Sequence, residues 1–194
     1  MRAAISFLKH TLIFLLIACL TSACIAESSS ALPLEAYTEP ASRFSIAIPQ
    51  GWQASELPEE NVLAFTPADY SGEITELRVL LFAVETDTFD TQEHLDQANA
   101  LLEPFLTKYL DETYQVINQG ETEVAKSPAV LLDFAKPYGD LYLEGRLVMV
   151  AMPGYVLAFL GMGESQAWED FLPTFRAMLT EFQLLPLSEV TPTP

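Results

Sequence analysis

Residues 141–163 read LYLEGRLVMVAMPGYVLAFLGMG, and this stretch decides the fold. Two apolar runs, at 141–152 and 155–162, predict strands, and Pro153-Gly154 between them predicts a tight hairpin. Residues 147–152 and 156–160 are apolar at every position, so both alternating faces of these strands need cover. The stretch therefore predicts an antiparallel pair that is buried on both sides.

Two amphipathic helices are predicted, one before this pair and one after it. Residues 91–110 and 165–182 repeat apolar residues at helical spacing, and Asp90 is the expected N-cap of the first helix. Pro104 and Pro173 are expected to bend these helices, because proline lacks the amide donor. The apolar stripes are Leu95, Ala98, Leu102, Phe105 and Tyr109 in the first helix and Trp168, Phe171, Leu172, Phe175, Met178, Leu179 and Phe182 in the second.

Further strands are predicted by short apolar runs that end at turn residues. An antiparallel sheet with a helix packed on each face would bury the two-sided central strands. The expected fold class is therefore α+β, with an antiparallel sheet sandwiched between helices in an α/β/α arrangement. The further strands cover residues 44–48, 61–65, 74–85, 113–118 and 129–135, with an additional candidate at 36–38.

The charge of the chain limits its partners. The 194 residues include 27 acidic and 9 basic ones, for a net charge of −18. Removal of a leader at 1–23 takes away Arg2 and Lys9 and no acidic residue, which leaves −20. Nucleic acid and anionic lipid would repel such a surface.

The roughly 170 residues that remain after the leader are enough for one domain. Because His94 is their one histidine, no metal site, cofactor or Cys/His catalysis is expected.

The N-terminus has the features of a secretory signal peptide. Arg2 and Lys9 accompany an apolar run at 11–20, and small residues follow at 21–24. The run is roughly 10 residues long, whereas a membrane-spanning helix needs roughly 20. A transmembrane helix would have to extend over 7–26, and Lys9 and His10 interrupt that segment.

Two short segments near the end of this leader, each ending in a cysteine, resemble the bacterial lipobox. In that motif the cysteine thiol receives a diacylglycerol, and the signal peptide is cut just before the cysteine. Residues 20–24 read LTSAC and residues 16–19 read LIAC. Cys24 is the preferred lipid attachment site, because the apolar run has ended there and a polar spacer follows. Cys19 is the alternative, since LIA is closer to the consensus triplet. Ordinary cleavage after Ala23 or Ala26, without lipid, is the third option.

The chain is therefore predicted to consist of four segments. Residues 1–23 form the lipoprotein signal peptide, and 24–42, rich in Ser, Ala, Pro and Glu, form a flexible tether. One domain occupies 43–185. Residues 186–194 form a disordered tail.

The segment at 44–52, FSIAIPQGW, resembles the opening strand and P-x-G-W turn of the PsbP-like and DcrB-like proteins. Three features follow in the order of that family, at 126–129 (KSPA), 153–155 (PGY) and 175–182 (FRAMLTEF). Pro49 and Gly51 would shape the turn, and Trp52 would fill the end of the core. The resemblance covers 36–185 and implies a binding or accessory domain, since the family includes an extrinsic photosystem II subunit and many bacterial lipoproteins. Fold likeness alone assigns no activity.

Catalytic motifs in the sequence are weak. Residues 163–167 resemble a nucleophile elbow around Ser165, but no histidine follows it, and a helix N-cap explains the serine better. Gly161-Met162-Gly163 is expected to be a turn rather than a phosphate cradle, because a third glycine and a lysine are missing. Asp133 and Glu144 on adjacent strands are no evidence of acid–base chemistry in so acidic a chain.

The remaining candidates are also expected to be structural. Acidic clusters lack the glycine and distal glutamate of a calcium loop and are expected to be solvated. The aromatic residues at helix or strand spacing are expected in the core or at its rim, and His94 at an edge. The acidic residues are Glu85, Asp87 and Asp90, and Glu56, Glu59 and Glu60; the aromatic ones are Trp52, Trp168, Tyr114, Tyr138 and Tyr155.

These features predict a membrane-tethered lipoprotein on the extracytoplasmic face of the cell membrane. Its domain is expected to be a monomer that is not an enzyme and binds an unassigned protein partner at the envelope. The alternative is a carrier of a small apolar ligand, with a binding pocket between the sheet and one helix. An enzyme would need a cleft that gathers polar groups around Ser165 or Asp133.

Overall fold

The computed structural model describes residues 30–40, 44–57, 62–85, 91–110, 112–152 and 155–185. Cys19, Cys24, the whole predicted leader and the tail at 186–194 lie outside these residues, so the predictions made for them stay predictions. None of the described helices is long and apolar enough to cross a membrane.

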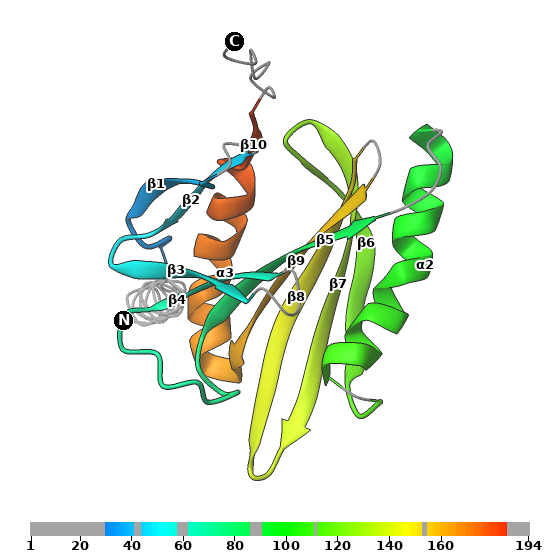
Figure 1. Ribbon diagram of the computed structural model, residues 1–194. Helices are drawn as coiled ribbons and strands as arrows, with labels where there is room; N and C mark the ends of the chain where they lie inside the picture. The colour runs from blue at the N-terminus through cyan, green and yellow to red at the C-terminus, as the bar shows by residue number, and fades with distance from the viewer. Residues whose placement is uncertain are drawn as a thin grey trace, which may run out of the picture. The chain divides into compact units, whose positions relative to one another are not determined.

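A seven-stranded antiparallel sheet is the centre of the domain (Figure 1). The strands β8 and β9 lie in its interior, as the two-sided apolar runs predict. Their pairing runs from Leu143 opposite Glu164 to Met152 opposite Tyr155. The turn between them, 153–154, lies outside the described residues. In sheet order the strands are β3 (Trp52–Leu57), β4 (Val62–Pro67), β5 (Arg78–Glu85), β9 (Tyr155–Glu164), β8 (Leu141–Met152), β7 (Ser127–Tyr138) and β6 (Gln115–Val124).

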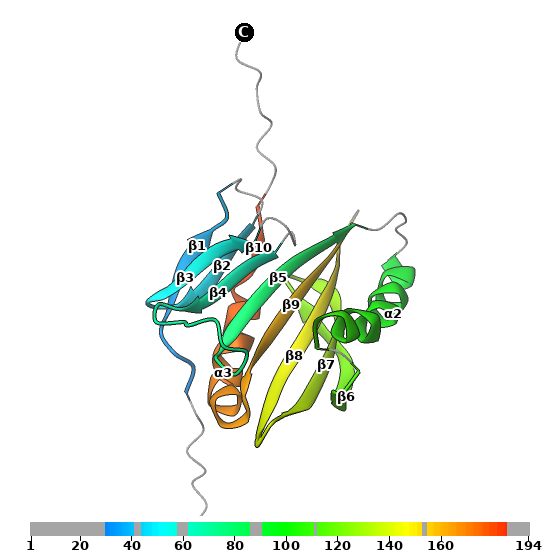
Figure 2. The same cartoon turned by 60° about the horizontal axis from the view of Figure 1, so that its bottom comes forward.

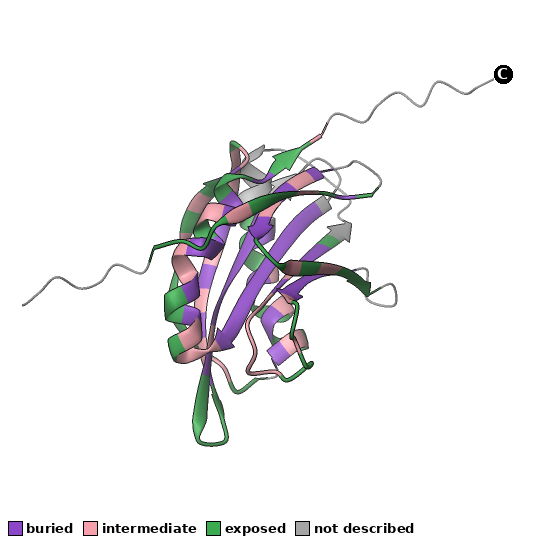
Figure 3. Cartoon of the chain, turned by 90° about the vertical axis from the view of Figure 1, so that its left-hand side faces the viewer, coloured by how far each residue is buried: buried purple, intermediate pink, exposed green. Residues whose placement is uncertain are grey.

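The two faces of this sheet carry separate apolar clusters. Along β8, Leu147 and Met149 belong to the cluster that contains residues of α2 (Thr91–Leu110). Val148 and Val150 belong to the cluster that contains residues of α3 (Ser165–Thr180). This alternation is the period of two that a strand imposes on its side chains. Figure 3 shows the resulting burial along the central strands.

A second, three-stranded sheet packs beside α3 (Figure 2). Its order is β1-β2-β10, where β1 is Leu34–Thr38, β2 is Phe44–Pro49 and β10 is Gln183–Leu184. Phe44, Ile46 and Ile48 of β2 join the α3 cluster. The α+β class and the antiparallel sheet are thus confirmed. The predicted α/β/α description is too simple, because the described residues form ten strands and only two helices, and α3 shares its side with this second sheet.

The predicted elements differ from the observed ones mainly at exposed strands. The edge strand β3 was not predicted, because most of its side chains are exposed and show no apolar alternation. The other edge strand, β6, extends to Val124 rather than 118 for the same reason. The strand β5 begins at Arg78 rather than 74, because Glu76 accepts hydrogen bonds from Ser71 and Gly72 and so holds a loop. The helix α2 matches its prediction, and α3 ends at Thr180 rather than 182.

The turn at Pro49–Trp52 has the predicted geometry at its glycine but a less buried tryptophan than expected. Gly51 has φ of 80°, a left-handed conformation that favours glycine. The Trp52 indole is half-buried and stacks on Phe171 of α3, with centroids 5.0 Å apart and planes at 6°. It therefore covers the rim of the α3 cluster rather than filling the end of the core.

Trp52→Ala is expected to lower the free energy of unfolding by about 2 kcal/mol. The change removes one stacked ring pair and uncovers Phe171, but leaves no closed cavity. Urea denaturation measures the loss, with Tyr142→Ala as the control, since Tyr142 is 56% exposed. Equal midpoints for the two variants would show that the indole contributes no packing.

Candidate functional site

Ser165 is held by a carboxylate on a neighbouring strand. It is the first residue of α3, and its Oγ donates a hydrogen bond to Oε1 of Glu144 on β8, at 2.6 Å. Glu164 occupies the N-cap position, and no side chain caps the helix. The predicted N-cap role of Ser165 is therefore wrong, because its hydroxyl is turned to β8 instead of to the first turn. His94 belongs to α2, whose described apolar residues join the cluster on the other face of the sheet, and the His94 side chain is not among the described ones.

Asp133 bonds to Arg146, an arginine to which no sequence motif points. Arg146 lies directly opposite on β8 and donates from Nε and Nη2 to the two carboxylate oxygens, at 2.5 and 2.9 Å. Asn118 on β6 adds a third hydrogen bond at 3.2 Å. The Arg146 and Asp133 side chains are only 11% and 20% exposed. Asp133 and Glu144 thus have separate partners, and only the strand register reveals the ion pair.

Asp133→Ala is expected to lower the free energy of unfolding by about 2 kcal/mol, because it leaves the Arg146 guanidinium largely buried without its carboxylate. Chemical denaturation measures the loss. The double variant Asp133→Leu with Arg146→Met is expected to recover most of the stability, since it removes both charges and keeps apolar volume. A double variant that is less stable than Asp133→Ala would contradict this account.

Gly161 and Gly163 lie within β9 rather than in the predicted turn. A Cβ atom at Gly161 would lie 2.7 Å from the Trp168 ring and 2.8 Å from the Phe175 ring. A Cβ atom at Gly163 would lie 2.6 Å from Leu77. The turn prediction is wrong, because these glycines belong to a strand. They leave space for the side chains of Trp168 and Phe175 of α3 and of Leu77.

The other predicted candidates are scattered. Glu59, Glu60, Asp87 and Asp90 lie outside the described residues, as does the Tyr155 side chain. Trp168 is buried and Tyr114 half-buried, as predicted, whereas Tyr138 is 47% exposed and does not belong to the core rim. In the described part of the chain, no three His, Cys, Asp or Glu side chains are grouped to hold a metal ion.

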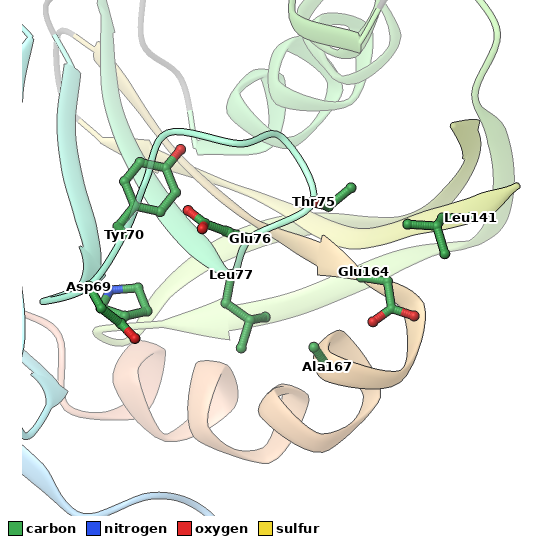
Figure 4. Close-up of a pocket in the computed structure, with 9 residues that line it drawn as sticks. Asp69, Tyr70, Thr75, Glu76, Leu77, Leu141, Glu164 and Ala167 are labelled. Atoms are coloured by element: carbon green, nitrogen blue, oxygen red, sulfur yellow. The ribbon is translucent and has the colours of Figure 1, made fainter. Parts of the chain in front are cut away.

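A surface cleft of about 370 Å³ lies at the N-terminal end of α3, and we call it the α3 cleft (Figure 4). Four segments build it: the loop after β4, the end of β9, the first turn of α3 and the start of β8. Glu164 N donates to Thr75 O at 2.8 Å and joins the loop to the helix start. The lining residues are Pro67, Asp69, Tyr70, Thr75, Glu76, Leu77, Leu141, Glu164 and Ala167.

The polar part of the α3 cleft is acidic. The hydroxyl of Ser71 donates to Glu76, as do the backbone N–H groups of Ser71 and Gly72, and these bonds hold the pKa of Glu76 below its usual range. Glu76 therefore stays ionised at pH values where an ordinary glutamate would begin to protonate, and the loop loses these bonds only as the pH falls through the lowered pKa. Nearby, Arg78 donates to the Tyr70 hydroxyl at 3.1 Å.

Comparison with known proteins identifies the fold. No protein-family model matches the chain, and no curated protein matches it in sequence. Among solved structures, the cyanobacterial PsbP (CyanoP) of Synechocystis sp. PCC 6803 aligns with a TM-score of 0.57 at 15% identity, covering 83% of this chain and 95% of its own. LpqN of Mycobacterium tuberculosis gives 0.58 at 11% identity, covering 79% and 92%. The Saccharomyces cerevisiae Ran-binding protein Mog1p gives 0.58 at 9% identity, covering 79% and 96%. Identities this low show the fold alone, and the chain has the PsbP-like fold.

Proposed function

We propose that this protein is a lipid-tethered accessory domain on the extracytoplasmic face of the cell membrane, and that it binds a protein partner without catalysing a reaction. The observation that carries the binding role is the α3 cleft, which lies beside exposed apolar side chains on a domain with two well-filled clusters. The leader and Cys24 carry the tethering role.

Two further points support this proposal. Ser165 bonds to Glu144 and Asp133 bonds to Arg146, so Ser165 and Asp133 have separate partners. The structural neighbours also include proteins with binding or envelope roles: Mog1p is a Ran-binding protein, and LpqN is involved in cell envelope biogenesis. Sharing a fold transfers neither role by itself.

Native mass spectrometry of the protein extracted from its own membranes tests the proposal. The expected result is a diacylated chain that begins at Cys24, together with a second polypeptide. A bare chain that begins near Ser22–Glu27 would overturn the tethering. A chain that carries a small apolar molecule and no polypeptide would support the carrier instead.

A further inference from the structure

Exposed apolar surface extends from the β7–β8 hairpin into the α3 cleft. Tyr138 and Leu141 are cross-strand partners, so their side chains lie on the same side of the hairpin. They are 47% and 45% exposed. Leu141 also lines the α3 cleft together with Leu77 and Ala167 (Figure 4). Exposed aromatic and aliphatic side chains next to a cleft are typical of the core of a protein–protein interface.

The charge around this apolar surface selects the kind of partner. Asp69, Glu76 and Glu164 line the same cleft. The guanidinium of Arg78 lies close by but donates to the Tyr70 hydroxyl and to the backbone oxygen of Glu73. The cleft therefore has three carboxylates and one nearby arginine, on a chain whose net charge is −18. Such a field attracts a basic partner and repels an acidic one.

A partner with separate basic side chains can pair with the individual carboxylates of this cleft. Within the described ranges, no three metal-ligating side chains are grouped to hold one metal ion. Lysine and arginine side chains can lay their aliphatic stems on apolar residues while their charged ends reach carboxylates. We infer that the α3 cleft and the Tyr138–Leu141 side of the hairpin dock a basic, amphipathic segment of a protein partner. This inference rests on the proposed binding function and gives the partner its chemistry.

Titration of the purified protein with a peptide that alternates lysine and leucine tests the inference. We expect changes in backbone amide chemical shifts to concentrate at 67–77, 138–142 and 163–168, with an affinity that falls as salt is added. Two control peptides replace every lysine by glutamate or every leucine by serine. Both are expected to bind more weakly, because each lacks one of the two complementary features.

Charge variants locate the electrostatic part of the binding. Asp69→Asn with Glu164→Gln is expected to raise Kd roughly fivefold or more, as two partly exposed ion pairs are lost. The matched control is Glu121→Gln with Glu123→Gln, which removes the same charge from two exposed positions on the edge strand β6. The control is expected to change Kd by less than about twofold. Equal effects of the two pairs would mean nonspecific attraction and would overturn the inference.

A pair of variants at exposed apolar positions locates the apolar part of the binding. Tyr138→Ala is expected to raise Kd roughly tenfold, because an interface tyrosine contributes a large contact area. Ile117→Ala is its control: Ile117 is 59% exposed on the edge strand β6 and does not line the α3 cleft. Equal losses for the two variants would overturn the inference, and so would insertion of Tyr138 into phosphatidylcholine vesicles without any peptide binding.

This assay is independent of the lipid and of the natural partner. If the lysine–leucine peptide fails to bind while native mass spectrometry still finds a second polypeptide, the binding function stands and the assigned partner chemistry is wrong. If neither experiment finds a polypeptide ligand, both proposals are wrong.

Discussion

Gly145→Ala is expected to lower the free energy of unfolding by about 3 kcal/mol or more. Gly145 of β8 lies directly opposite Phe134 of β7. A Cβ atom at this position would lie 2.5 Å from Cζ of Phe134 and closer still to the backbone oxygen of Gly161. The Phe134 ring is fully buried, and a backbone oxygen cannot rotate away as a side chain can. The central strands would therefore have to move apart.

Gly120→Ala is the matched control for this substitution. Gly120 lies on the edge strand β6, and a Cβ atom there would meet nothing within 4 Å. Its expected effect is within about 0.5 kcal/mol, because alanine restricts the unfolded chain without a clash in the folded one. Urea denaturation of both variants gives the comparison. A Gly145→Ala variant as stable as Gly120→Ala would contradict the close packing of Phe134 on β8.

Cys24→Ser is expected to move almost all of the protein from the membrane fraction to the soluble fraction. In the proposed anchor the thiol of Cys24 receives the diacylglycerol, and a serine hydroxyl does not replace that thiol. The described helices offer no membrane-spanning segment. A single loss of the anchor therefore removes most of the membrane affinity. Fractionation followed by intact-mass measurement checks the result.

Cys19→Ser is the control for this experiment. It is expected to leave the protein in the membrane fraction with the mass of a diacylated chain that begins at Cys24. If Cys19→Ser releases the protein and Cys24→Ser does not, Cys19 is the acylated residue. If neither variant releases it, the leader itself is the anchor.

The interior of the fold was predictable because its signals are local. The strands β8 and β9 are apolar on both faces, and α2 carries an apolar stripe at every turn, so burial leaves a direct trace in the residue pattern. The strands β3 and β6 lie at the edges of the large sheet, where exposed polar side chains leave no such trace. The sequence at Gly161 predicts a turn, because nothing in its neighbours along the chain shows that Trp168 and Phe175 lie against it.

The candidate site was not predictable, because it has no motif. The α3 cleft combines residues from four separate segments, and each of them is ordinary in its own stretch of sequence. Strand spacing predicts Tyr138 at the core rim, because spacing does not show where the hairpin extends beyond the cover of the helices. The ion pair of Asp133 and Arg146 likewise depends on a register that only the paired strands reveal.

The small sheet also sets the order in which the domain can fold. The strand β2 pairs on one side with its neighbour β1 but on the other with β10, where Gln183 meets Ser45 and Leu184 meets Phe44. Leu32 N also donates to Thr174 Oγ1 at 2.8 Å, and the Phe182 ring contacts those of Phe44 and Phe159. Contacts between such distant residues slow folding, since a long loop must close before they form. A chain that emerges with its N-terminus first therefore keeps one edge of β2 unpaired until almost its whole length is available.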